Sequence, residues 1–187
     1  HRKLKFLQVY SENMSKKTKP AIDEFKEKPF TRIKFKPDLN RFGITELGDE
    51  FISIIRKRVY DAAAWVDPKM KVYWNNYKIP IKTFDDYVKL YIGNQSMVYE
   101  KLDDYWELAV TYSNDDEFDQ VSFVNGINTL RGGKHVDYIV DQIKTKITTI
   151  IKKKRKITIK PTYVKNQLFL FLKATIVNPA FDSQTKE

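Results

Sequence analysis

The sequence predicts an α+β fold, a mixed sheet with a right-handed crossover helix. Apolar residues recur at helical spacing from residue 136 to residue 151, which predicts about 19 residues and roughly 28 Å of helix. Residues 167–177 are almost wholly apolar, as in a strand that is buried on both faces. A strand, a long helix and a buried strand in that order indicate a crossover within one sheet.

The N-terminal part of the chain predicts two strands. The first covers residues 4–10, and a polar, lysine-rich connection follows in residues 12–28. In residues 30–35, cationic and apolar side chains alternate, which is typical of a second strand.

The middle of the chain predicts two helices around a hairpin. An amphipathic helix covers residues 49–64, with two acids in its first turn, where the helix dipole favours negative charge. Asn75 and Asn76 tolerate positive φ and predict a tight hairpin turn. Thr83 is a suitable N-cap for a short helix that ends near Tyr91.

Three further strands are predicted before the long helix, at residues 97–102, 105–112 and 120–124. A solvated turn at residues 114–117 separates the last two. Together with residues 167–177, these strands supply the predicted sheet.

The composition is that of a globular chain without cysteine chemistry. At 187 residues and 42% hydrophobic content, the chain can bury one sizeable core. The absence of cysteine excludes disulfides, thiolate metal sites and cysteine nucleophiles. The longest apolar run, residues 168–172, is far shorter than the roughly 20 residues of a membrane helix, so we expect no membrane span. The chain starts at His1 without a methionine, and we expect it to be a fragment of a longer polypeptide.

The net charge of +10 is concentrated in two segments. Residues 1–36 hold eleven Lys or Arg against four acids, and residues 143–165 hold nine against none. One or two cations at the end of the long helix would complement its dipole, whereas five in a row repel one another unless a polyanion is near. This basic cluster therefore predicts contact with DNA phosphates, without sequence readout. Its members are Lys152, Lys153, Lys154, Arg155 and Lys156.

Gln184 and Lys186 lie near the C-terminus, after an apolar strand and an Asn178-Pro179 turn. Their side chains offer hydrogen-bond donors suited to a phosphate or a carboxylate. A lysine that reaches a transferring phosphoryl group would stabilise the charge that develops there. Spacing alone favours the simpler interpretation of Lys186 as a solvated surface lysine.

Three other groups invite a chemical role, and a structural interpretation is favoured for each. His135 lies near the start of the long helix, where capping or packing explains it, because the sequence places no partner for a triad or metal site nearby. The three tryptophans are expected in the core or on the exposed hairpin, not in a base-stacking platform. The acids within residues 103–107 are expected on a solvated face, not at a metal.

Six short motifs lie between residue 36 and residue 187. They are KPDLNRF at 36–42, RVYD at 58–61, SFVNGI at 122–127, GGKHV at 132–136, NPAF at 178–181 and QTKE at 184–187. In their order and spacing these motifs resemble the transducer domain of eukaryotic type IIA DNA topoisomerases, and the resemblance covers nearly the whole chain. The two most specific are SFVNGI, upstream of the long helix, and QTKE at the C-terminus.

The resemblance implies a domain organisation. Residues 39–187 would form a transducer domain with the fold of ribosomal protein S5 domain 2, which gyrase, topoisomerase and mismatch-repair ATPases share. Residues 1–38 would be the C-terminal strands of a preceding ATPase domain of the GHKL class, or a linker remnant, with the boundary near residues 37–42.

The resemblance also implies a coupling role between ATP and DNA. Gln184 and Lys186 would sense the γ-phosphate of ATP, and the basic cluster would face DNA. ATP and Mg²⁺ would be bound mainly by the nucleotide-binding domain, whose glycine-rich lid and magnesium-binding asparagine helix this chain lacks. The chain alone is therefore expected to be inactive. The expected partners are double-stranded DNA, the protein's own nucleotide-binding domain and DNA gate, and a second copy in a homodimer, in the nucleus.

Two alternatives remain at this point. A free-standing basic nucleic-acid-binding protein of S5-like fold would bind RNA in a salt-dependent way and would have no use for Lys186. A domain of a mismatch-repair ATPase is disfavoured because the SFVNGI and QTK motifs together resemble topoisomerases.

Overall fold

The structure is a computed structural model that describes residues 3–182. Gln184 and Lys186 lie outside the described residues. The chain divides into two compact units, residues 1–52 and 53–187. The division falls within the first turns of a 17-residue helix, α1 (Asp49–Trp65), whose predicted position is confirmed.

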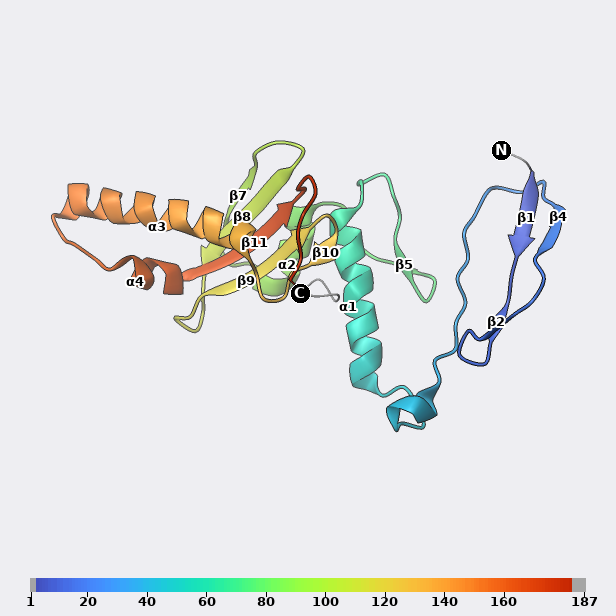
Figure 1. The fold of residues 1–187 in the computed structure, drawn as a ribbon. Helices are drawn as coiled ribbons and strands as arrows, with labels where there is room; N and C mark the ends of the chain where they lie inside the picture. The colour runs from blue at the N-terminus through green and yellow to red at the C-terminus, as the bar shows by residue number, and fades with distance from the viewer. Residues whose placement is uncertain (1–2, 183–187) are drawn as a thin grey trace. The chain divides into compact units, whose positions relative to one another are not determined.

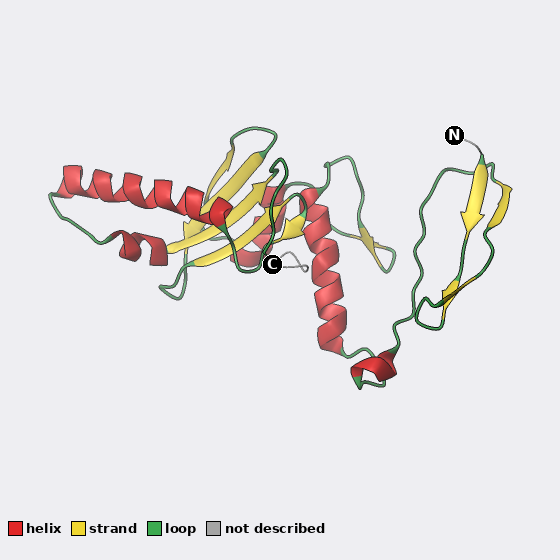
Figure 2. Ribbon diagram, viewed as in Figure 1, coloured by secondary structure: helices red, strands yellow, loops and turns green. Residues whose placement is uncertain are grey.

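The N-terminal unit contains a long irregular hairpin and an extended segment (Figure 2). β1 (Leu4–Leu7) pairs with β4 (Ala21–Glu24), and β2 (Tyr10–Ser11) pairs with β3 (Lys16–Lys17), both antiparallel. The predicted first strand is therefore present in two pieces. A 3₁₀ turn, η1 (Leu39–Phe42), follows the extended segment.

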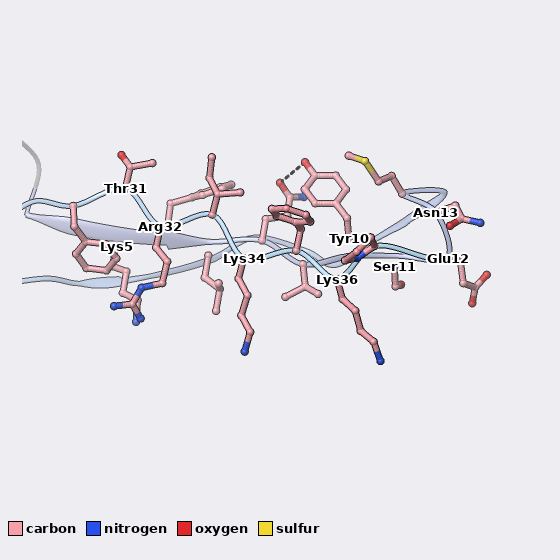
Figure 3. A pocket seen from close by; sticks show the side chains of 18 of the residues that line it. Lys5, Tyr10, Ser11, Glu12, Asn13, Thr31, Arg32, Lys34 and Lys36 are labelled. Carbon is pink, nitrogen blue, oxygen red and sulfur yellow. Dashed lines mark hydrogen bonds between the residues drawn. The ribbon is translucent and has the colours of Figure 1, made fainter. Parts of the chain in front are cut away.

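Two expectations for this unit are wrong. Residues 16–17 and 21–24, expected in a polar connection, form β3 and β4, and residues 30–35, expected as a strand, are extended without strand pairing. The predicted alternation is present, since Arg32, Lys34 and Lys36 leave the backbone on one side (Figure 3). A strand also needs a neighbouring strand to complete its hydrogen bonds. Within the described chain β1 pairs with β4 in a two-stranded sheet, and residues 30–35 pair with neither.

The C-terminal unit is built on a mixed sheet of five strands in the order β10-β9-β11-β8-β7 (Figure 1). β11 lies in the middle, parallel to β9 and antiparallel to β8. The chain passes from the β9 edge to β11 through two helices, α3 (Lys134–Arg155) and α4 (Pro161–Asn166). The predicted α+β fold with a crossover helix is confirmed. The strands are β7 (Val98–Lys101), β8 (Trp106–Tyr112), β9 (Asp119–Val124), β10 (Ile127–Asn128) and β11 (Leu168–Ala174).

Helices cover both faces of this sheet. On one face, α1 and α2 (Phe84–Ile92) enclose a core that includes Phe171 of β11. On the other face, the first turns of α3 pack against Leu170 and Leu172. Consecutive residues of β11 thus enter opposite cores, which confirms the predicted burial on both faces. The core under α1 and α2 contains Ala63, Ala64, Ile79, Ile81, Phe84, Tyr87, Val88, Ala109, Phe123 and Phe171.

The predicted turn and cap are confirmed as well. Asn75 and Asn76 adopt φ of 46° and 64° between β5 (Tyr73–Trp74) and β6 (Tyr77–Lys78). Thr83 caps α2 in a reciprocal capping box with Asp86. The sequence did not predict β10, α4 or η1, which are only two to six residues long and show too little periodicity to be recognised.

Candidate functional site

The C-terminal segment leaves the sheet at the end of β11, held between two loops. Thr175 N donates to Tyr105 O at 2.7 Å, and Asn125 N donates to Ala174 O at 3.0 Å. The Asn125 side chain then pairs with both backbone groups of Ile176. Its Nδ2 donates to Ile176 O at 2.9 Å, and its Oδ1 accepts from Ile176 N at 2.8 Å.

This attachment lies eight positions before Gln184. Asn178 has a positive φ of 50°, in agreement with the predicted Asn178-Pro179 turn. The assignment of Gln184 and Lys186 to a phosphate falls outside the described residues and stays a prediction. The structure shows how the segment that carries them is attached to the sheet.

Asn125 and Gly126 form the turn between β9 and β10, with φ of 50° and 82°. Positive φ at both central residues is the type I′ pattern of tight hairpins. The indole of Trp65, the last residue of α1, lies against Gly126, because a Cβ at Gly126 would be 3.3 Å from two atoms of that ring. Position 126 therefore has no room for a side chain unless Trp65 moves.

Lys173 of β11 connects the same region to the end of α1. Its Nζ donates to Ala64 O at 3.3 Å, lies 3.5 Å from Glu107 Oε2, and sits 5.4 Å from the centre of the Trp65 ring. A cation over an indole face is an attractive arrangement. We call Trp65, Asn125, Gly126, Lys173 and Ile176 the exit cluster.

The exit cluster was not predicted from the sequence. The SFVNGI motif contains Asn125 and Gly126, but nothing in its spacing indicates that Asn125 pairs with a residue 51 positions later. The dipeptide Asn125-Gly126 is a hairpin signal, and only that part was accessible from sequence.

The basic cluster lies at the end of α3 that extends past the sheet (Figure 1). Lys152 to Arg155 occupy the last turn of α3, so four of the five cations are on a helix and not on a loop. Lys156 is the C-cap, with φ of 59°, and its N–H donates to Lys152 O at 3.1 Å. All five are exposed, and within residues 3–182 none makes an ion pair.

His135 has a packing role, as expected. Its Nε2 lies 3.0 Å from Thr129 Oγ1 and 3.2 Å from Ser122 Oγ, which ties the start of α3 to the β9–β10 hairpin. Burial lowers the pKa of His135, so the neutral ring is favoured. Ser122 is fully buried and inaccessible to any substrate.

The tryptophans and the acids also follow the structural interpretation. Trp65 and Trp74 pack against the core under α1 and α2, and Trp106 packs against the core under α3. Asp103 accepts from the backbone N–H groups of Tyr105 and Trp106, both at 2.7 Å, as the residue that starts a turn.

Within residues 3–182 no group of three or more His, Asp or Glu side chains is arranged for a metal ion. The Gly132-Gly133 turn before α3 is not an open phosphate cradle, because the His135 ring lies 3.3 Å from where a Gly133 Cβ would be. Among the described helices, none is long and apolar enough to cross a membrane.

Comparison with known proteins agrees with this architecture. The profile of the family described as DNA gyrase B matches residues 71–187. The chain belongs to the DNA gyrase B family. Within this family it is 44% identical to DNA topoisomerase 2 of Arabidopsis thaliana, over 98% of this chain and 13% of that protein. It is 42% identical to the probable DNA topoisomerase 2 of Dictyostelium discoideum, over 97% of this chain and 12% of that protein.

Solved structures of topoisomerase II and of a DNA gyrase have the same fold. The ATPase region of Saccharomyces cerevisiae topoisomerase II is 40% identical with a TM-score of 0.89, over 99% of this chain and 48% of that one. The ATPase and transducer domains of DNA topoisomerase II from Balamuthia mandrillaris are 37% identical with a TM-score of 0.89, over 100% of this chain and 49% of that one. The B-subunit of Myxococcus xanthus DNA gyrase, at 15% identity and a TM-score of 0.60, shares the fold. The resemblance seen in the motifs is confirmed.

Proposed function

We propose that this chain is the transducer, with the last strands of the ATPase domain, of an ATP-dependent type II DNA topoisomerase. In that enzyme it couples ATP binding and hydrolysis to the passage of one DNA duplex through another. The observation that carries the proposal is the match of 99% of the chain to a topoisomerase II ATPase region at 40% identity and a TM-score of 0.89. The same match favours this function over a free-standing RNA-binding protein or a mismatch-repair domain.

The parent protein in this proposal is a nuclear homodimer that acts on double-stranded DNA. Its nucleotide-binding domain holds most of the contacts to ATP and Mg²⁺, and its DNA gate receives the motion that the transducer transmits. The chain spans 12% to 13% of the two topoisomerases named above, which leaves room for both parts in a parent of similar length.

The proposal assigns residues 1–38 to the edge of the ATPase domain. Within the part of this segment that the structure describes, the strands form no buried core of their own, and the side chains of Phe6, Ile33 and Phe35 are exposed. Exposed apolar residues on two neighbouring extended segments are typical of a surface that another part of the protein covers.

Gln184 and Lys186 are proposed to contact the γ-phosphate. A lysine amine is a compact point charge that suits a phosphoryl group, and a glutamine amide can orient the same group by hydrogen bonding. The attachment of the chain at Ile176 supports this role, because it directs the following residues from a fixed point on the sheet.

Lys186→Ala in the full-length enzyme tests this assignment. We expect ATP turnover to fall by about 100-fold, with nucleotide affinity largely kept, because the charge acts mainly on the developing transition state. The measurement is steady-state turnover together with equilibrium binding of an ATP analogue, with and without duplex DNA. Lys71→Ala removes another exposed lysine and serves as the matched control. Equal turnover in the two variants would refute the role of Lys186.

The basic cluster is proposed to contact the DNA backbone. Five exposed cations without ion pairs inside residues 3–182, in a segment that has no acids, form a locally positive surface. Most lie in the last turn of a helix, so their backbone positions are fixed while the long side chains can reach different phosphates.

Replacing Lys152, Lys153 and Lys154 by Ala in the full-length protein tests the DNA contact. The slope of log affinity against log salt concentration should shrink by about 0.9 for each phosphate that the variant no longer neutralises, equally for unrelated duplex sequences. A variant with Lys69, Lys71 and Lys78 replaced by Ala removes the same charge elsewhere in the C-terminal unit. If the two triple variants have the same salt slope, the cluster does not touch DNA.

A further inference from the structure

We infer that Asn125 is a positioning residue for the C-terminal segment that carries Gln184 and Lys186. It acts through its paired hydrogen bonds to Ile176. The inference rests on the proposed role of Lys186. It adds a residue that touches neither nucleotide nor DNA and whose effect on turnover passes through the backbone of the C-terminal segment.

Asn125 and Ile176 are joined by two hydrogen bonds. One primary amide satisfies the N–H and the C=O of the same residue, at 2.8 Å and 2.9 Å. This pair of bonds fixes the orientation of the Ile176 peptide groups as well as their position. Within the described chain, residues 177–180 make no hydrogen bond, so the contact is the last such attachment before residue 181.

The hairpin turn at Asn125-Gly126 does not need this contact. Asn75 occupies the equivalent position of the β5–β6 turn, with φ of 46° against 50° for Asn125. Its side chain makes no hydrogen bond within the described chain, so an asparagine serves such a turn by tolerating positive φ alone. We call the two hydrogen bonds from the Asn125 side chain to Ile176 the clamp. The clamp is therefore a separate function of the Asn125 side chain.

The Asn125-Gly126 turn that holds Ile176 is itself supported by packing. The Asn125-Gly126 turn packs against the Trp65 indole, and Trp65 is held in turn by Lys173. The clamp is thereby tied to α1 and to β11 at once. Because a misplacement of about 1 Å at a reacting group can cost about 100-fold in rate, the anchor of the segment should matter for turnover.

Asn125→Gly in the full-length enzyme tests the inference, because glycine keeps the positive-φ turn and removes only the amide. We expect kcat for ATP to fall about tenfold, with KM changed less than twofold. Asn125→Asp keeps the acceptor for Ile176 N but places a carboxylate oxygen against Ile176 O, where two acceptors repel, so its kcat should fall at least as far as that of Asn125→Gly. Asn75→Gly makes the same change in the other turn and should leave kcat unchanged.

Hydrogen exchange in the same proteins measures the clamp directly. The Ile176 amide should exchange about fivefold faster in Asn125→Gly, while the Thr175 amide, bonded to Tyr105 O, should not change. Faster exchange at Ile176 with unchanged kcat in both Asn125 variants would overturn the inference. So would a loss of kcat without any change in exchange.

The Lys186→Ala background separates the inference from the proposed function. If Asn125 acts by placing Lys186, adding Asn125→Gly to Lys186→Ala should cause no further loss of kcat. A further tenfold loss in the double variant would mean that Asn125 acts by another route, and the inference would fail while the role of Lys186 stands. If Lys186→Ala alone leaves turnover unchanged, the proposed function fails first.

Discussion

At the residue scale, buried polar side chains connect elements that are distant in the sequence. Asp61 of α1 is 5% exposed and accepts from Tyr87 Oη of α2 at 2.7 Å and from Lys57 Nζ at 2.9 Å. The Tyr87 and Tyr91 hydroxyls are 2.9 Å apart. Burial, with these hydrogen bonds, raises the pKa of Tyr87 well above its usual value. The network fixes how α1 and α2 meet over the sheet, because a buried carboxylate without partners is costly.

His135 gives a prediction at the same scale. Burial lowers its pKa, partly opposed by Asp137, so the unfolded state binds the proton more readily than the folded state. The contribution of the neutral ring to stability is present above the usual pKa of 6.5 and should be lost as the pH falls towards the lowered value. Urea unfolding at pH 8, 7, 6 and 5 should show this loss, and His135→Gln should show less of it. An identical pH dependence in the variant would contradict the prediction.

At the element scale, α3 extends past the sheet that it crosses (Figure 1). Its buried residues, Val136, Ile139 and Val140, are all in the first two turns. On the rest of its apolar face Ile143, Ile147 and Ile151 are half-buried and Ile150 is exposed, although α3 also contacts α4. A helix end of this kind presents charge away from the core, and its stability depends on its cap.

The cap of α3 gives a prediction for that element. Lys156 adopts the left-handed conformation, with φ of 59°, where a side chain costs free energy that glycine does not. Lys156→Gly should therefore be more stable than Lys156→Ala by about 1 kcal/mol, although both remove the same charge. Urea unfolding of the two variants measures the difference. Equal stabilities would mean that the helix end rearranges in the alanine variant.

At the scale of the whole molecule, the two units differ in whether their described residues form a hydrophobic core. The C-terminal unit has two cores, one on each face of its sheet. The described part of the N-terminal unit has none, and its extended segment at residues 30–35 carries Ile33 and Phe35 with 85% and 79% of their surface exposed. If residues 1–38 belong to an ATPase domain, this segment gains a strand neighbour only in the parent protein.

Hydrogen exchange of residues 31–35 tests that idea. In the full-length protein we expect these amides to exchange at least tenfold more slowly than in the isolated chain, because a paired strand protects its N–H groups. The hairpin amides of β1 and β4 serve as the internal reference, since their pairing is already present in this chain. Fast exchange at residues 31–35 in both proteins would argue against the assignment.

The sequence by itself determined the elements whose signals are local. The spacing of apolar residues located α3, the two-sided apolar run located β11, and the Asn75-Asn76 and Thr83 signals located a turn and a cap. Each of these signals lies within a few neighbouring residues. The basic cluster was likewise visible as a run of charge, and the family motifs indicated the family.

Only the tertiary structure decided which segments pair. Residues 30–35 have the alternation of a strand, yet residues 21–24 take the place beside β1. Asn125 belongs to a recognisable turn, yet its bond to Ile176 spans 51 positions. The physical reason is that the periodicity of a sequence reports the conformation of one segment. Strand pairing and the Asn125–Ile176 hydrogen bonds also depend on the position of a second backbone that is distant in the sequence.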